Sequence, residues 1–182
     1  MHSGNVSETK EAGRLTFREP VESDGPAIYA LIERCKPLDI NSRYCYLILT
    51  AHFASTCAVA ERAGEVVAFI SAYIPPQTRD TLFVWQVAVD ASLRGQGMAK
   101  MLLRHLLGRQ SLKGIRFVEA TVNPSNDASR ALFTSLAREC SSEIQETLLF
   151  GEELLGEGEH EQENLIRVGP IDSVRKTLIG RK

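Results

Sequence analysis

The chain has 182 residues and a net charge of −2, and its 43% hydrophobic and 24% charged residues are typical of a soluble globular protein. No apolar run approaches the roughly 18–20 residues of a membrane-spanning helix. No dense tract of Lys and Arg with interleaved aromatic residues indicates a nucleic-acid surface. We therefore expect neither a membrane nor a nucleic-acid partner.

The first 12 residues are polar and lack the apolar core of a signal peptide, which predicts a disordered leader over residues 1–12. One domain is expected over residues 13–170, because the chain contains no internal repeat and no low-complexity linker. Residues 171–182 are expected to be a C-terminal tail, either a short helix or a loose segment. Residues 152–163 include six glutamates and no Lys or Arg, which is typical of a solvated flap.

Apolar periodicity predicts two helices and three strands in the first half of the chain. Ser23 or Asp24 is expected to cap the first helix, with Pro26 in its first turn, and Pro37 is expected to stop it. The second is expected to start near Ser42. The strands expected here are residues 15–18, 56–61 and 66–74, with a turn at Ala63-Gly64 between the last two.

The second half alternates strands and helices. Residues 81–89 (TLFVWQVAV) are apolar on both alternating faces apart from Gln86, which predicts a central strand covered on both sides. The elements expected after it are a helix from Met98, a strand over 115–121, a helix capped by Asn126, and strands over 144–150 and 164–168. Consecutive strands imply hairpins, and strand–helix–strand units imply parallel neighbours. The expected fold class is α/β (α+β), a mixed sheet with helices on both faces.

Four cysteines are scattered along the chain and form no CxxC pair, which argues against a structural zinc site. We expect four unpaired thiols, no metal, and the reducing environment of the cytoplasm. These cysteines are Cys35, Cys45, Cys57 and Cys140.

A glycine-containing turn joins the central strand to the next helix. Val87-Ala88-Val89 ends the strand, and Arg94-Gly95-Gln96-Gly97-Met98-Ala99 opens the helix. Glycines let the backbone point its amides at one spot, and the helix dipole adds to the attraction, so the turn predicts an anion site suited to a pyrophosphate. The spacing matches neither a Walker A loop nor a Rossmann fingerprint.

These residues resemble a known superfamily. Arg94-x-x-Gly97-x-Ala99 after a Val-Ala-Val strand resembles the acyl-CoA motif of the GNAT acetyltransferases. Asn123 to Ala128, followed by Ala131-Leu132-Phe133, is similar to the second CoA segment of that superfamily. The resemblance covers about residues 14–168 and implies a mixed sheet of about six to seven strands and acetyl-CoA as co-substrate.

Longer stretches resemble a narrower family, the L-2,4-diaminobutyrate acetyltransferases. They are residues 37–46, 71–76 and 80–89, and the ending from His160 and Glu163 to Pro170. This resemblance implies acetylation of the γ-amine of diaminobutyrate in the synthesis of ectoine, a bacterial osmoprotectant. It also implies a homodimer.

The GNAT resemblance implies direct attack of an amine on the thioester in a ternary complex. Val87 and Val89 would pair with the pantetheine amides, and the Val87 amide is the expected oxyanion donor. Arg94 to Ala99 would hold the pyrophosphate, and Asn126 would reach the pantetheine arm. Lys100 and Arg104 either add charge near the phosphates or are solvated helix residues.

A side-chain amine with a pKa of about 10.4 is mostly protonated near pH 7 and must lose a proton before it attacks. By resemblance, the residues expected to bind the diamino acid are Asp39, Tyr44, Trp85, His160 and Glu163. Glu163 is the preferred ammonium partner, and the base is Glu163, His160 or an ordered water.

Four of these residues also have a structural interpretation. Asp39 can cap the nearby helix, and Tyr44 can lie at the edge of the core. Trp85 can be a core residue, and His160 can be a solvated loop residue.

One position departs from the superfamily pattern. Phe133 stands where many GNAT enzymes have a tyrosine that protonates the leaving thiolate. Tyr44 or a water would replace it, or the thiolate leaves unprotonated, which a thiol pKa of about 8.5 tolerates.

Two other functions use the same features. A peptide N-acetyltransferase could receive basic peptides on the acidic segment 152–163. A non-catalytic regulator would bind acyl-CoA without turnover.

Overall fold

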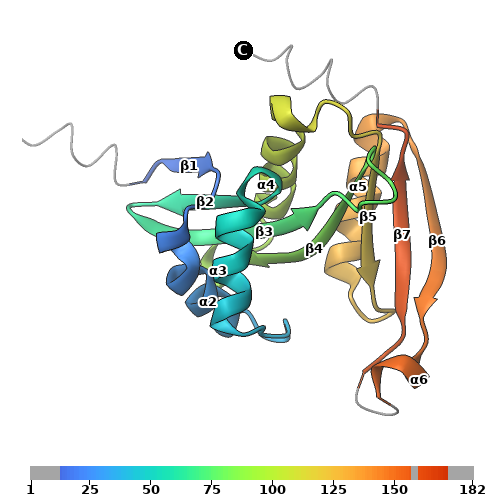
Figure 1. Ribbon diagram of the computed structural model, residues 1–182, viewed down its shortest axis with the longest axis horizontal. Helices are drawn as coiled ribbons and strands as arrows, with labels where there is room; N and C mark the ends of the chain where they lie inside the picture. The colour runs from blue at the N-terminus through green and yellow to red at the C-terminus, as the bar shows by residue number, and fades with distance from the viewer. Residues whose placement is uncertain (1–12, 157–159, 172–182) are drawn as a thin grey trace, which may run out of the picture. The chain divides into compact units, whose positions relative to one another are not determined.

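The computed structural model describes residues 13–156 and 160–171 (Figure 1). The expected leader 1–12, residues 157–159 of the acidic segment and residues 172–182 of the expected tail lie outside the described residues. Seven strands hydrogen-bond in the order β1-β2-β3-β4-β5-β7-β6. Because β4 and β5 run parallel while β1–β2, β2–β3, β5–β7 and β6–β7 run antiparallel, the sheet is mixed, as the sequence predicts.

The described chain forms two compact units. The first contains the residues up to Ser71 together with Gln86–Leu106, and the second contains Ala72–Trp85 together with the residues from Leu107 onward. The single domain expected over 13–170 stays a prediction. No helix within the described ranges is long and apolar enough to cross a membrane.

The first unit has β1, β2 and β3 side by side and three longer helices. Its elements are β1 (Leu15–Arg18), η1 (Glu22–Asp24), α2 (Gly25–Glu33), α3 (Arg43–His52), η2 (Ala54–Thr56), β2 (Ala58–Arg62), most of β3 (Glu65–Tyr73), the end of β4 (Thr81–Val89), η3 (Ala91–Leu93) and α4 (Met98–Leu107). Ala63 and Gly64 join β2 to β3 with φ of 54° and 80°, the positive values that a tight hairpin requires.

Two of the expected boundaries in this unit are wrong. The first helix ends at Glu33 rather than at Pro37, and Cys35 follows it with its buried thiol donating to the carbonyl of Val89 at 3.3 Å. The strand expected from residue 56 starts at Ala58, because Ala54–Thr56 form a 3-10 turn first. The second helix does start after Ser42, whose hydroxyl accepts from the amide of Cys45.

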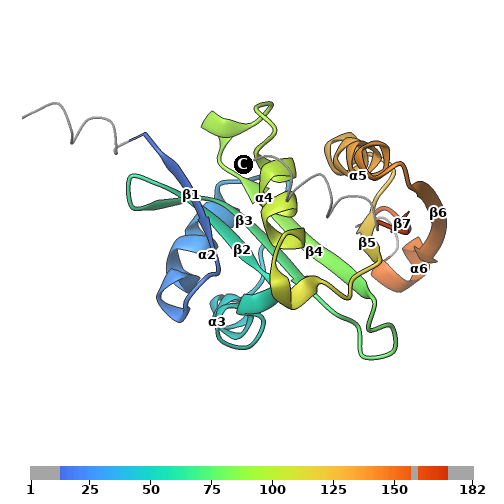
Figure 2. The ribbon, with the colours of Figure 1, turned by 90° about the horizontal axis from the view of Figure 1, so that it is seen from above.

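Helices cover both faces of β1–β3 in this unit (Figure 2). Buried residues of α2 and α3 pack on Val59 of β2 and Phe69 of β3. Phe17 of β1 lies opposite Ala60, one residue along from Val59, so its ring points to the other face. There it stacks on His105 of α4, with ring centroids 5.7 Å apart.

A charged cluster joins β1, β2 and η1. The guanidinium of Arg18 donates to both carboxylate oxygens of Asp24, at 2.6 and 2.9 Å, and to Glu61, at 2.8 and 3.0 Å. The amide of Val21 also donates to Asp24. Asp24 is therefore the first residue before α2 as expected, but its side chain holds Arg18 instead of capping that helix. Burial disfavours its ionisation, yet these hydrogen bonds outweigh burial and lower the pKa of Asp24.

The second unit begins with Ala72–Tyr73 of β3 and Thr81–Trp85 of β4. Its further elements are η4 (Gln110–Leu112), β5 (Phe117–Val122), α5 (Asp127–Cys140), β6 (Glu143–Phe150), α6 (Glu152–Leu155) and β7 (Glu163–Gly169). Asn126 caps α5 as predicted, accepting from the amide of Ser129 at 3.0 Å. The acidic segment was expected to be a loop, but its first residues form the short helix α6.

At the end of this unit, Ile171 is buried and its amide donates to the carbonyl of Arg116 at 2.8 Å. Residue 171 was expected to begin the tail. The packed part of the chain therefore extends at least one residue further than that boundary.

The Arg18–Asp24 pair yields a stability prediction. We expect Asp24→Asn to lower the free energy of unfolding by about 2 kcal/mol at pH 7, because the charged hydrogen bonds to Arg18 are lost. A depressed pKa stabilises the folded chain above the ordinary pKa, and this contribution is lost as the pH falls through the folded value. The difference between wild type and variant, measured by urea unfolding, should be constant from pH 5 to 8 and shrink below about pH 4. A difference that grows on acidification would contradict it.

Candidate active site

The end of β4 is held in place by several hydrogen bonds. The carbonyl of Val89 accepts from the thiol of Cys35 at 3.3 Å and from Nε of Arg94 at 3.2 Å. The amide of the next residue, Asp90, donates to the carbonyl of Val67 at 2.9 Å. These contacts come from α2's C-terminal side, β3 and the loop itself, so the strand ends in a fixed position.

Asp90 in turn organises the loop that follows. One carboxylate oxygen accepts from the amide and the hydroxyl of Ser92, at 3.0 and 2.8 Å, and the other accepts from Nε of Arg34 at 3.1 Å. The bonds from Ser92, with that from Arg34, lower the pKa of Asp90. The carboxylate therefore stays ionised at neutral pH and keeps the loop shaped.

The glycines before α4 adopt a conformation that other residues rarely adopt. Gly95 and Gly97 have φ of 73° and 76°, with the extended Arg94 before them. A Cβ at either glycine would meet nothing within 4 Å, so the need for glycine is conformational and not steric. Left-handed residues in such a loop turn successive amides toward one side, and the first turn of α4 adds its unpaired amides. The loop can therefore hold an anion such as a pyrophosphate.

Two neighbours of these glycines have side chains engaged within the protein. Nε2 of Gln96 donates to the carbonyl of Ser92 at 2.8 Å, and Met98 is buried in the core. Both residues can still offer their backbone amides to a ligand. Lys100 and Arg104 lie half-buried on α4.

The segment before α3 presents two of the expected substrate residues. Asp39 is exposed, and Ser42 caps the helix, so the interpretation of Asp39 as the helix cap is wrong. Tyr44 lies in the first turn of α3 and is 70% exposed, so it is not a core-edge residue.

A side chain that the sequence analysis did not assign to the site holds this segment. Nε2 of Gln86 donates to the carbonyl of Asp39 at 2.7 Å, and its Oε1 accepts from the hydroxyl of Tyr46 at 3.3 Å. The signal was present in the sequence, since Gln86 interrupts an otherwise apolar strand.

The second unit contains the other expected site residues. Trp85 is 47% exposed, which excludes a core role, whereas Phe133 is buried on α5. Glu163 begins β7 and its Oε2 is buried, and His160 is exposed. Asn126 uses its side-chain oxygen to cap α5, which leaves its amide nitrogen as the donor toward any ligand.

A polar network fixes the start of β7 on both sides of Glu163. Gln162 donates to Asn164 at 3.0 Å, and Asn164 donates to Glu146 of β6 at 2.8 Å. Arg130 of α5 binds both oxygens of Glu146 at 2.6 Å, and these bonds, from Arg130 first and Asn164 second, lower the pKa of Glu146. Glu161 also accepts from the amide of Ser125 at 3.0 Å. Glu161 and Gln162, near the end of the acidic segment 152–163, are therefore anchored by hydrogen bonds.

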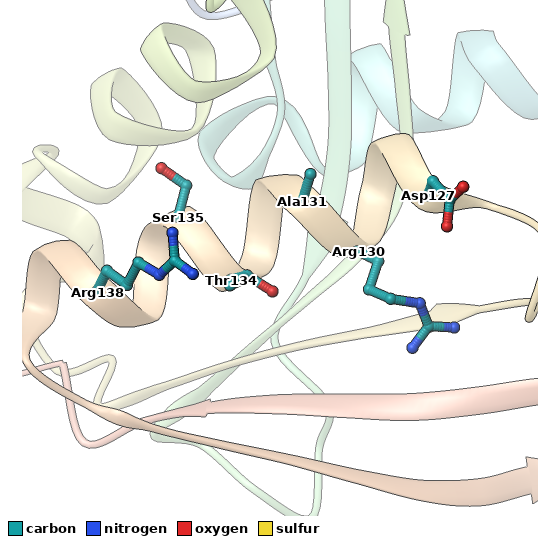
Figure 3. A pocket seen from close by; sticks show the side chains of 6 residues that line it. All are labelled: Asp127, Arg130, Ala131, Thr134, Ser135 and Arg138. Carbon is teal, nitrogen blue, oxygen red and sulfur yellow. The ribbon is translucent and has the colours of Figure 1, made fainter.

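A shallow groove follows one face of α5 in the second unit (Figure 3). None of the expected site residues lines it. Arg130 extends from the helix toward the strands, where Glu146 binds it, so much of its charge is already neutralised. The residues that line the groove are Asp127, Arg130, Ala131, Thr134, Ser135 and Arg138.

The structure thus distributes the expected residues over the two units. The first contains Asp39, Tyr44, Val87, Val89 and the loop from Arg94 to Ala99, and the second contains Trp85, Asn126, Phe133, His160 and Glu163. Within residues 13–156 and 160–171, no group of three His, Cys, Asp or Glu side chains is arranged to hold a metal ion.

Comparison with known proteins places the chain in a family. The model of the acetyltransferase (GNAT) family matches residues 25–137. L-2,4-diaminobutyric acid acetyltransferase from Shouchella clausii is 46% identical, with 87% of this chain and 89% of the relative covered. The enzyme of the same name from Bordetella parapertussis is 42% identical, with 92% and 90% covered.

A similar solved structure is an enzyme of the same activity as these relatives. It is the diaminobutyrate acetyltransferase EctA from Paenibacillus lautus, in complex with its substrate L-2,4-diaminobutyric acid and coenzyme A. It is 44% identical, with a TM-score of 0.84, and 87% of this chain and 96% of that chain are covered. The chain therefore belongs to the GNAT acetyltransferases and, within them, to the family of L-2,4-diaminobutyric acid acetyltransferases.

Proposed function

We propose that this enzyme transfers the acetyl group of acetyl-CoA to the γ-amine of L-2,4-diaminobutyrate, by direct attack of the amine in a ternary complex. The main support is the solved enzyme in complex with diaminobutyric acid and coenzyme A. It is 44% identical to this chain, and the comparison covers 87% of this chain. The glycine loop before α4 supports the cofactor half of the proposal, because its shape suits a pyrophosphate.

In this proposal the first unit supplies the main cofactor contacts. Arg94 to Ala99 hold the pyrophosphate through backbone amides. The backbone of Val87 and Val89 hydrogen-bonds with the pantetheine arm. Val87 makes more of these hydrogen bonds, because the carbonyl of Val89 already accepts from two protein donors. The amide of Val87 stabilises the oxyanion as negative charge develops on the thioester carbonyl.

By family resemblance, Asn126 and Phe133 are also assigned to the cofactor. The amide nitrogen of Asn126 donates to the pantetheine arm while its oxygen keeps capping α5. Phe133 provides an apolar wall and has no proton to give. The leaving thiolate therefore takes a proton from Tyr44 or from water, or leaves unprotonated, which a thiol pKa of about 8.5 tolerates.

For the substrate, we assign the carboxylates of Asp39 and Glu163 to its ammonium groups. Tyr44 and His160 donate to its carboxylate, and Trp85 walls the pocket. We propose Glu163 as the general base, which removes the proton from the amine directly or through a water. The partly buried position of Glu163 supports this role, since a carboxylate shielded from bulk water attracts a cation more strongly.

The proposed biological setting follows from the family. The reaction belongs to the synthesis of ectoine, an osmoprotectant, and takes place in the cytoplasm. We keep the expected single catalytic domain over residues 13–170 as a proposal, extended by the buried Ile171.

We further propose that the enzyme is a homodimer that pairs through β6. This strand is at one end of the sheet order, and all eight of its residues are exposed. Its large apolar side chains are Ile144, Leu148, Leu149 and Phe150, exposed by 40% to 60%. An apolar edge strand of this kind is normally covered, and two identical edges can pair antiparallel about a two-fold axis.

The substrate assignment is tested with a panel of amines. With acetyl-CoA present, release of CoA should be at least tenfold faster, as kcat/KM, with diaminobutyrate than with ornithine or lysine, and the product should carry the acetyl group on the γ-nitrogen by NMR. Faster acetylation of a basic peptide would instead support a peptide acetyltransferase. Tight binding of acetyl-CoA without turnover of any amine would support a regulator.

The role of Glu163 is tested by Glu163→Gln, with Glu152→Gln in the exposed part of the same acidic segment as the matched control. We expect kcat/KM for diaminobutyrate to fall by about 10²-fold or more at pH 7, with little change in the KM for acetyl-CoA. The loss should be smaller at pH 9, because a larger fraction of an amine with a pKa of about 10.4 is then already deprotonated. Equal rates for wild type and Glu163→Gln across pH 7–9 would rule out this role.

The dimer is tested by Leu148→Asp, which places a charge on the most exposed apolar residue of β6. Sedimentation velocity should show a dimer for wild type and for the control Gln77→Asp, which adds the same charge in an exposed turn, and a monomer for Leu148→Asp. A monomeric wild type would contradict the dimer. A dimeric Leu148→Asp would show that the interface lies elsewhere.

A further inference from the structure

Gln86 interrupts the apolar run of β4, and its side chain forms part of a closed chain of hydrogen bonds. The amide of Asn41 donates to the hydroxyl of Tyr46 at 3.1 Å, and this hydroxyl donates to Oε1 of Gln86 at 3.3 Å. Nε2 of Gln86 then donates to the carbonyl of Asp39 at 2.7 Å. Both ends of the chain are backbone groups with fixed roles, a donor at Asn41 and an acceptor at Asp39. The orientation of the Gln86 amide is therefore determined.

The middle of this chain is anchored in the core. Tyr46 is fully buried, and its ring contacts Tyr29 edge to face, with centroids 6.1 Å apart. Arg43 covers the Tyr29 ring at 4.5 Å. Because side chains alternate along a strand, Gln86 shares a face of β4 with the buried Ala88, which packs in the same core cluster as Tyr46.

The group that is held is, by contrast, exposed. Asp39 and Ile40 are exposed and belong to no helix or strand. Between them, Gln86 and Tyr46 bind this segment on both sides of Ile40. The segment leads directly into Ser42, the cap of α3, and hence to Tyr44 in the first turn.

We infer that Gln86 is a positioning residue for the amine substrate, which acts by holding the segment Asp39–Asn41 so that the Asp39 carboxylate is presented in one place. This inference rests on the proposed function, in which Asp39 binds an ammonium group of diaminobutyrate. Gln86 precedes Val87, the proposed oxyanion donor. The same strand therefore holds the segment Asp39–Asn41 and positions the amide that is proposed to bind the thioester carbonyl.

A segment ordered before the substrate arrives binds it more tightly, because less conformational freedom is lost on binding. Loss of the clamp should therefore raise the KM for diaminobutyrate. It should leave the KM for acetyl-CoA nearly unchanged, because the glycine loop is held by Asp90 and not by Gln86.

The test uses the full chain and steady-state kinetics with both substrates. For Gln86→Leu we expect about a fivefold rise in the KM for diaminobutyrate and less than a twofold change in the KM for acetyl-CoA. Gln86→Glu keeps the acceptor for Tyr46 but places an oxygen against the Asp39 carbonyl, and it should have a similar effect. The control Gln110→Leu, at an exposed position in η4, should match wild type.

The decisive variant combines Gln86→Leu with Asp39→Asn. If Gln86 acts through Asp39, the double variant should have the same KM for diaminobutyrate as Asp39→Asn alone. Two results would overturn the inference and leave the proposed function standing. One is a double variant in which the two single increases in the KM for diaminobutyrate multiply. The other is an unchanged KM in Gln86→Leu while Asp39→Asn raises it. An unchanged KM in Asp39→Asn would instead refute the proposed role of Asp39 and, with it, the inference. Should Gln86→Leu fail to fold, Gln86→Glu and Tyr46→Phe carry the same comparison.

Discussion

The carbonyl of Val89 and the carboxylate of Asp90 determine where β4 stops and the loop toward α4 begins. Cys35 and Arg94 donate to the carbonyl of Val89, and Ser92 and Arg34 donate to the carboxylate of Asp90. The left-handed glycines that follow can direct their amides usefully only if the chain enters the loop from a fixed point. Electrostatic stabilisation of a bound anion depends on donors that are already in place, so the proposed cofactor site depends on this small set of bonds.

The same strand serves two purposes because its side chains alternate between faces. On one face, Gln86 reaches the segment before α3, and Ala88 joins the core formed by α2 and α3. The backbone of Val87 and Val89 remains next to the glycine loop. A single extended element thus links the ordering of the exposed segment before α3 to the position of the glycine loop before α4, all within the first unit.

In the second unit, ion pairing and hydrogen bonds stabilise a region rich in acidic residues. Arg130 neutralises Glu146, and Glu161 accepts from a backbone amide before α5. Gln162 and Asn164, the neighbours of Glu163, belong to the same network. The acidic segment is therefore not simply a solvated flap. Its last residues are fixed by polar contacts, which is what a carboxylate needs if it is to meet a cation in a defined geometry.

The sequence by itself determined the features that depend on local pattern. The bounds of β4, the caps Ser42 and Asn126, the Ala63-Gly64 turn and the GNAT motif all follow from neighbouring residue types. Only the tertiary structure decided the features that join distant residues. Asp24 binds Arg18 instead of capping its helix, and α2 ends at Glu33 with Cys35 bonded to Val89. Gln86 meets Asp39 across 47 positions of the chain, and no local periodicity encodes such a contact, because it forms only when β4 and α3 pack together.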